Sequence, residues 1–468
     1  MINILIIGAG EAGQTVLKEI LENRTLNRRF NVVGFIDDKK DSVEGYSVLS
    51  SIDNVSTVIK SYNIQEVIIA IPSAKRGVIE RIISSLNDCD VTIKIVPGVM
   101  DIINGHFNIN QIRDIEITDL LGREEIGFDE EELILQYRDQ VVLVTGGGGS
   151  IGLEIIKQLL LLPTKKVIAL GHGENSIYDL IGKFGTDPRF DYIIGDVKDY
   201  SKLIHEFNRF KPDRVFHAAA HKHVPLMEKF PDEAVKNNII GTYNCAKASI
   251  ASGVKRFNLV STDKAVNPTS VMGTTKRIGE MIIHSLNSIQ TGCKLSFTRF
   301  GNVLGSKGSV VPLFKKQINN GGPLTVTHPD ITRYFMSIPE AARLVLKAGV
   351  LEDGDLFILE MGDPIKITDL AKKMISLSGY APEDIDIKYT GLRAGEKLYE
   401  ELLTKSEEIV ETGYERLLVS KHRQKNLTED EIYQLINNLK EICETYDNDL
   451  IKKELKIWVN EYQETVCQ

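Results

Sequence analysis

Short apolar runs rich in β-branched residues alternate with amphipathic segments along most of the chain. In the first hundred residues each run is short enough to be a buried parallel strand. These runs are residues 2–7, 32–36, 66–71 and 91–96. A glycine-rich turn with Gly8, Gly10 and Gly13 follows the first run and precedes an amphipathic stretch, the order typical of a Rossmann unit. The pattern predicts a small N-terminal α/β domain over residues 1–121, with a regulatory or structural role.

The alternation restarts at Val141, after an acidic stretch that we interpret as a linker over residues 122–137. A second glycine-rich turn follows the new strand, and strands and helices then alternate to about Val303. Residues 305–414 are richer in glycine, proline and charge, which favours a substrate-binding lobe. We therefore expect a catalytic domain over residues 138–424. The predicted fold is α/β, with two Rossmann-like, doubly wound parallel-sheet domains.

The last segment, residues 425–468, has the pattern of a structural helix. Thr428 and Glu431 have the spacing of a capping box, and apolar residues then recur at helical intervals. We assign this segment no chemical role.

Composition narrows the function. The net charge of -9 over 468 residues gives no general attraction to nucleic acid. The five cysteines are scattered without a C-x-x-C pair, so we expect neither a metal site nor disulfides, and a reducing cytoplasm is indicated. No apolar run approaches the roughly 20 residues that span a bilayer. We expect a cytoplasmic homo-oligomer, or one attached through partners to the inner face of the membrane.

The second glycine-rich turn predicts a dinucleotide site. Glycines there let backbone N–H groups and a helix N-terminus approach a pyrophosphate, although a turn without a ligand is the alternative. Further cofactor contacts are expected where later strands end. The predicted cofactor residues are Gly146, Gly149, Ser150, Ile151, Gly152, Glu174, Asn175, Asp196, Val197, Ala218, Ala219 and Ala220. The usual acid after the second strand is either displaced to Glu174 or lost, so both NAD and NADP fit.

Polar residues follow another strand at residues 257–260. Thr262, Asp263 and Lys264 stand where its carboxyl end is expected, the edge at which open α/β sheets bind ligands. Met272 and Lys276 follow shortly afterwards. This arrangement favours an active site over a surface loop.

At these positions the chain resembles the large UDP-N-acetylglucosamine 4,6-dehydratases, or CapD-like polysaccharide biosynthesis proteins, of the extended short-chain dehydrogenase/reductase superfamily. The resemblance covers nearly the whole chain. It rests on the glycine-rich turn and on residues 218–228, 261–268, 299–312 and 393–397. It implies a tightly bound NAD or NADP that is regenerated in each turnover.

The resemblance also implies catalytic roles. Lys264, if neutral, takes the C5 proton of the sugar, and Asp263, if protonated, gives a proton to the departing 6-hydroxyl. Lys276 binds the nicotinamide ribose. Met272 stands where the superfamily has a tyrosine, which is similar to the branch that retains the C5 configuration. Methionine takes no proton, so Thr262, a water or ionised Asp263 remain candidates for the 4-hydroxyl proton.

For the UDP-sugar, the resemblance suggests residues from several segments. They are Asn302, Ser309, Lys315, Arg333, Arg393 and Glu396. His221 and Lys222, beside a strand end, are candidates for contacts with the sugar, and the alternative is that they only support the site. Arginine and lysine suit the diphosphate, and a carboxylate suits ribose hydroxyls. The alternatives are a UDP-sugar 4-epimerase, which normally needs the missing tyrosine, and a catalytically silent NAD(P)-sensing scaffold.

Overall fold

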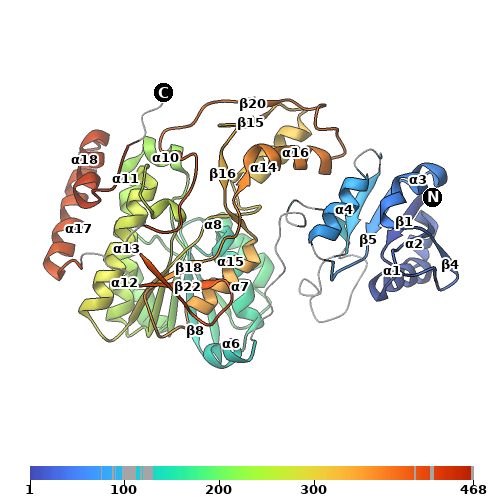
Figure 1. The fold of residues 1–468 in the computed structure, drawn as a ribbon. Coiled ribbons are helices and arrows are strands. Elements are labelled where there is room, and N and C mark those ends of the chain that lie inside the picture. Colours follow the sequence, from blue (N-terminus) through green and yellow to red (C-terminus); the bar gives the residue numbers. More distant parts are fainter. Residues whose placement is uncertain are drawn as a thin grey trace. The chain divides into compact units, whose positions relative to one another are not determined.

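The computed structural model describes residues 1–74, 76–86, 89, 91–96, 112–115, 117, 119, 130–404, 407–421 and 426–464 (Figure 1). The chain forms two compact units. The first unit contains Met1–Glu125, Val310–Thr325 and Thr368–Lys388. The second contains Ile126–Ser309, Val326–Ile367 and Tyr389–Gln468. Two later segments are therefore grouped with the N-terminal residues.

The first unit is built on a mostly parallel sheet. Within the described residues its seven strands have the order β3 (Ser42–Val43), β4 (Tyr46–Ser50), β2 (Phe30–Ile36), β1 (Ile2–Ile7), β5 (Glu66–Ile69), β6 (Thr92–Ile95) and β7 (Arg113–Asp114). The helices of this unit include α1 (Glu11–Glu22), α3 (Val55–Tyr62), α4 (Arg76–Leu86), α14 (Val310–Asn319) and α16 (Ile367–Leu377). Lys373 of α16 pairs with Glu80 of α4 at 3.0 Å.

The second unit contains a larger sheet, of nine strands in the described part of the chain. Their order is β10 (Phe190–Ile194), β9 (Lys166–Gly171), β8 (Val141–Thr145), β11 (Arg214–His217), β12 (Arg256–Val260), β13 (Lys294–Arg299), β18 (Leu356–Leu359), β22 (Leu417–Lys421) and β21 (Glu408–Glu411). Pairing is parallel from β10 to β18, and antiparallel from β18 to β21. The order reverses next to β8, the switch point at which doubly wound folds bind ligands. The α/β prediction is confirmed.

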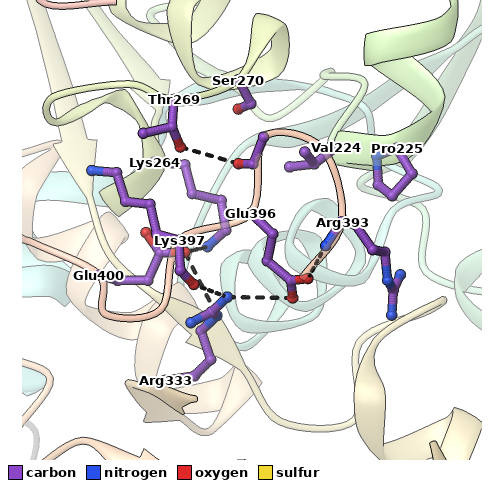
Figure 2. A pocket seen from close by; sticks show the side chains of 11 residues that line it. Val224, Pro225, Lys264, Thr269, Ser270, Arg333, Arg393, Glu396, Lys397 and Glu400 are labelled. Atoms are coloured by element: carbon purple, nitrogen blue, oxygen red, sulfur yellow. Dashed lines mark hydrogen bonds and ion pairs between the residues drawn. The ribbon is translucent and has the colours of Figure 1, made fainter. Parts of the chain in front are cut away.

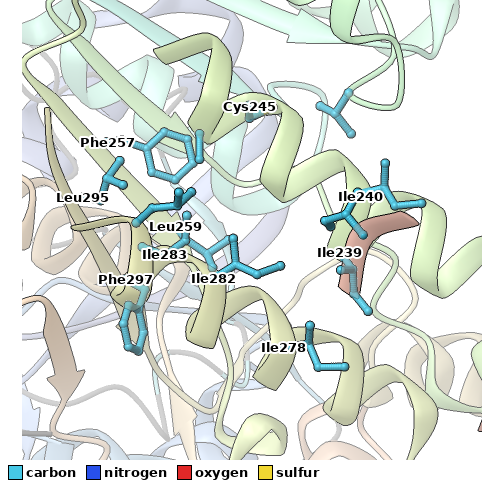
Figure 3. Packing of buried hydrophobic residues seen from close by; sticks show 14 of the residues in the cluster. Ile239, Ile240, Cys245, Phe257, Leu259, Ile278, Ile282, Ile283, Leu295 and Phe297 are labelled. Atoms are coloured by element: carbon cyan, nitrogen blue, oxygen red, sulfur yellow. The ribbon is translucent and has the colours of Figure 1, made fainter. Parts of the chain in front are cut away.

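Helices cover both faces of this sheet. One face packs against α6 (Glu130–Tyr137), α7 (Ser150–Leu161), α8 (Glu174–Phe184) and α15 (Ile338–Ala348). The other packs against α9 (Tyr200–Phe210), α12 (Gly241–Ala251) and α13 (Val271–Ile289). On that face Phe257, Leu295 and Phe297 from the strands lie beside Ile282 and Ile283 of α13, all fully buried (Figure 3). This apolar packing fixes the strand ends that carry the site.

The C-terminal segment forms α17 (Glu429–Glu444) and α18 (Asn448–Trp458), which pack onto the face that α12 and α13 cover. The predicted capping box is present, since the Thr428 hydroxyl accepts a bond from the Glu431 N–H and the Glu431 carboxylate accepts one from the Thr428 N–H. Within the described ranges, no helix is both long and apolar enough to cross a membrane.

Candidate active site

The turn between β8 and α7 is shaped for a phosphate. Gly146 has a φ of +68°, and a Cβ there would lie 2.6 Å from the backbone nitrogen of Ala219. A Cβ on Gly152 would lie 2.3 Å from the carbonyl oxygen of Gly146. The helix then starts at Ser150 with Gly149 as its N-cap, and no side chain caps it. The two glycines thus let the turn pack closely against its own backbone and against Ala219. The uncapped start of α7 leaves N–H donors where a pyrophosphate binds a Rossmann turn, so the turn fits a dinucleotide.

The other predicted cofactor residues follow neighbouring strands. Glu174 and Asn175 form the first turn of α8 after β9, and Asp196 and Val197 follow β10. The run of alanines, Ala218, Ala219 and Ala220, directly follows β11. Since β8, β9, β10 and β11 are parallel, these residues and the glycine-rich turn, which includes Ile151, share one edge of the sheet.

Lys276 lies on α13 and points to the end of β12. Its side chain is buried, and its Nζ donates to the carbonyl oxygen of Val260 at 2.8 Å. Burial lowers the pKa of Lys276 to about 8, although the carboxylate of Glu280 opposes this shift. Met272 lies one turn earlier on the same helix and belongs to the apolar core. Position 272 therefore offers no ionisable group.

Thr262, Asp263 and Lys264 form a hydrogen-bonded group just beyond β12. The Thr262 hydroxyl donates to Asp263 Oδ1 at 2.9 Å, and Lys264 Nζ donates to the same oxygen at 2.9 Å. Asp263 is fully buried, and its second oxygen, Oδ2, has no hydrogen-bond partner among the described residues. A buried carboxylate oxygen without a partner is costly unless a ligand supplies a donor.

Lys264 is held by three oxygen atoms. Besides Asp263, its Nζ lies 3.2 Å from Asn302 Oδ1 and 3.4 Å from Glu400 Oε1. Burial lowers the pKa of Lys264, but attraction to Asp263 and Glu400 outweighs it, and the pKa lies above its ordinary value. In this arrangement Lys264 is an ammonium ion, and it must lose a proton before it can act as a base.

A pocket opens beside Lys264 (Figure 2). Arg333 of β16 (Thr332–Arg333) crosses it, with its guanidinium 3.5 Å from Glu396 Oε1 and 3.6 Å from Glu400 Oε1. The side chain of Arg393 is exposed, and its backbone N–H donates to Glu396 Oε2 at 3.1 Å. The structure thus brings Lys264, Arg333, Arg393 and Glu396 together. The pocket also contains residues that were not among the predicted site residues, namely Val224, Pro225, Thr269, Ser270, Gly395, Lys397 and Glu400.

The remaining predicted substrate residues are more dispersed. His221 donates its backbone N–H to the Asn238 side chain at 2.8 Å, and Lys222 Nζ contacts the Ser306 hydroxyl at 3.4 Å. Burial, with repulsion from Lys264 as the smaller cause, lowers the pKa of Lys222. Ser309 has a buried hydroxyl without a partner in the described part of the chain. Lys315 lies on α14 of the first unit, so its predicted role stays a prediction.

A buried charge network supports the strand that carries the site. Arg299 is fully buried, and its guanidinium donates to Glu280 at 2.6 and 2.8 Å and to Glu407 at 2.9 Å. The Ser261 hydroxyl donates to Glu280 at 2.6 Å. Ser261 immediately precedes Thr262, so this network fixes the start of the segment that carries Asp263 and Lys264. Among the residues that the structure describes, no three or more histidine, cysteine, aspartate or glutamate side chains are grouped so that they could hold a metal ion.

We expect Gly152→Ala to reduce the nucleotide that copurifies with the protein. The new Cβ would contact the backbone of Gly146, so the turn must open, at a cost of about 1–3 kcal/mol. Denaturing the protein and quantifying the released nucleotide by mass spectrometry would measure how much of it each variant retains. The mass of the nucleotide from the wild-type protein would distinguish NAD from NADP. Gly182→Ala is the matched control, because nothing lies within 4 Å of its Cβ on α8. Equal nucleotide content in both variants would contradict the assigned cradle.

Two parts of the chain match models of known protein families. Residues 142–422 match a family described as "Polysaccharide biosynthesis protein", and residues 2–97 match one described as "CoA-binding domain". The first match contains the glycine-rich turn, the Thr262–Lys264 group and the pocket.

Three relatives match between 57% and 93% of this chain. The chain is 44% identical over 446 residues to the capsular polysaccharide biosynthesis protein CapD of Staphylococcus aureus, covering 93% of this chain and 74% of that protein. It is 37% identical over 273 residues to the UDP-N-acetylglucosamine 4,6-dehydratase (inverting) of Campylobacter jejuni, covering 57% and 78%. It is 36% identical over 292 residues to the UDP-glucose 4-epimerase of Rickettsia akari, covering 60% and 83%.

Proposed function

The chain belongs to the polysaccharide biosynthesis protein family, the CapD-like family that its motifs indicated, and we propose that it is a UDP-N-acetylglucosamine 4,6-dehydratase. Its membership supports an enzyme that modifies nucleotide sugars. The observation that carries the finer proposal is the hydrogen-bonded Asp263–Lys264 pair, whose lysine lines a pocket with two arginines. The position at which the superfamily usually has a catalytic tyrosine is occupied by Met272. Elimination of water needs an acid and a base, and this pair provides both.

The glycine-rich turn, the residues after β9 to β11 and Lys276 would hold the cofactor. When bound, NAD(P)⁺ supplies the oxidation, by taking a hydride from C4 of the sugar and giving it back at C6. The low pKa of Lys276 still leaves it mostly protonated at neutral pH, so it can hold a ribose hydroxyl as a cation.

The chain's own residues then move the protons. The 4-hydroxyl proton passes through Thr262 to ionised Asp263, along the 2.9 Å hydrogen bond between them. Once its ammonium group has released a proton to solvent, Lys264 takes the C5 proton, which the C4 ketone makes acidic. Asp263 then protonates the 6-hydroxyl, which leaves as water, and Lys264 returns its proton to C5. Because one group removes and returns this proton from one face, the C5 configuration is retained.

The proposal is tested by incubating the purified protein with UDP-N-acetylglucosamine and measuring the mass of the sugar nucleotide by mass spectrometry. A dehydratase yields a product lighter by one water. The principal alternative is a 4-epimerase, which the similarity to the Rickettsia protein favours. An epimerase would leave the mass unchanged and change only the C4 configuration, which a proton NMR spectrum distinguishes. An unchanged substrate with a bound dinucleotide would favour a silent scaffold.

A further inference from the structure

Glu400 contacts the proposed base from a segment far along the chain. Its side chain is 2% exposed, and Oε1 lies 3.4 Å from Lys264 Nζ and 3.6 Å from Arg333 Nε (Figure 2). Its second oxygen, Oε2, is buried and has no hydrogen-bond partner among the described residues. A carboxylate kept only for structure would normally have both oxygens satisfied. Its incomplete bonding, inside a pocket, indicates a functional role.

Three oxygens surround the Lys264 ammonium group. Its Nζ donates hydrogen bonds to Asp263 Oδ1 and Asn302 Oδ1, and it forms an ion pair with Glu400 Oε1. Two of these oxygens belong to carboxylates. The ammonium form is therefore favoured by two negative charges, of which only Asp263 has a part in the proposed proton transfers.

We propose that Glu400 is a positioning residue that holds the Lys264 amine in place and sets the pH at which it loses its proton. The inference rests on the proposed function for its catalytic meaning, because Lys264 is the proposed base. The contact between Glu400 and Lys264 is given by the 3.4 Å distance between them and does not depend on the proposed function. Four charged groups face Lys264: Asp263 beside it, Glu400, Arg333 of β16 and Lys222 after β11. The two carboxylates favour the ammonium ion, and the two cations oppose it.

Glu400→Gln separates charge from shape. The amide keeps the size and shape of the carboxylate beside Lys264, but the negative charge is gone and Arg333 loses one counterion. A charge at this distance shifts a pKa by about one to three units. The pKa of Lys264 should therefore fall by at least about one unit. Glu401→Gln is the matched control, because Glu401 is adjacent and half-exposed and pairs with Lys397 rather than Lys264.

The first measurement needs no turnover. Purified protein is labelled briefly with acetic anhydride across a series of pH values, and the acetylation of Lys264, whose side chain is 22% exposed, is read from its peptide by mass spectrometry. The labelling midpoint should move to lower pH in Glu400→Gln and stay at the wild-type value in Glu401→Gln. An unchanged midpoint in a folded Glu400→Gln protein would overturn the inference.

The second measurement follows dehydration. If Lys264 must be neutral, the rate rises with pH through its pKa, so the acid limb of the kcat profile should move to lower pH in Glu400→Gln by the same amount as the labelling midpoint. A limb that stays in place while kcat falls would contradict the role. A shifted midpoint in a protein that dehydrates nothing would support the charge relation and reject the proposed function, so the two failures are distinguishable.

Discussion

Replacing Lys264 with alanine should lower the rate of dehydration by about 10²- to 10⁴-fold, the range that a general base contributes. Without the amine, the C5 proton has no acceptor, although C4 can still be oxidised. The variant should therefore accumulate reduced cofactor, visible by nicotinamide absorbance, and should not exchange the C5 hydrogen with deuterated solvent. Exchange at the wild-type rate would show that another group is the base.

Two further variants make this result specific. Lys264→Ala leaves Asp263 and Glu400 without their shared cation, so its folding should be checked by thermal melting. Lys264→Gln keeps a donor toward Asp263 but has no basic nitrogen, and should lose exchange in the same way. Asp263→Asn should differ, because it removes the acceptor of the 4-hydroxyl proton as well as the acid for the 6-hydroxyl. Oxidation at C4 should then be blocked, so this variant should accumulate no reduced cofactor and should not exchange the C5 hydrogen.

Arg299→Ala should have the largest effect on stability, lowering the free energy of unfolding of the second unit by about 3–5 kcal/mol. The substitution leaves Glu280 and Glu407 buried without the guanidinium that both contact. Chemical denaturation, followed through the transition of this unit, would measure the loss. Lys366→Ala is the control, because its exposed pair with Asp330 at 3.3 Å is worth less than about 1 kcal/mol.

The stability lost in Arg299→Ala should be smaller at acidic pH than at neutral pH. Burial raises the pKa of Glu280, but Arg299 and the other partners of Glu280 lower it by more than burial raises it. The pKa of Glu280 therefore lies below its ordinary value of 4.5. A group with a depressed folded-state pKa contributes stability above its unfolded pKa, and the contribution is lost as pH falls through the folded value. The difference between wild type and Arg299→Ala should therefore shrink below about pH 4.5. A difference that is constant from pH 7 to pH 3 would mean that packing rather than charge dominates.

The sequence could predict those parts of the site that depend on local patterns. A glycine-rich turn between a strand and a helix has one geometry, and the structure shows it at Gly146 to Gly152. Thr262, Asp263 and Lys264 directly follow a strand, so their place at the sheet edge also follows from the order of elements. In both cases the relevant residues are neighbours in the chain.

Contacts between distant segments could not be predicted in this way. Glu400 reaches Lys264 only because the segment after β20 (Ile387–Tyr389) returns to the end of β12. Arg299 and Glu407 are separated by 108 positions and meet only in the folded core. Neither carboxylate belongs to a motif with a regular spacing. The protonation of Lys264 was also beyond sequence reasoning, because it depends on how many charges the fold brings to one amine.

The most direct test of the dehydratase mechanism follows a single hydrogen. The protein is incubated with UDP-N-acetylglucosamine that carries deuterium at C4, and the product is examined by NMR. Oxidation at C4 with hydride return to C6 predicts a 4-keto-6-deoxy sugar whose methyl group contains the deuterium, together with the loss of one water. Deuterium that returns to C4 in a sugar of unchanged mass would identify an epimerase and contradict the proposed function.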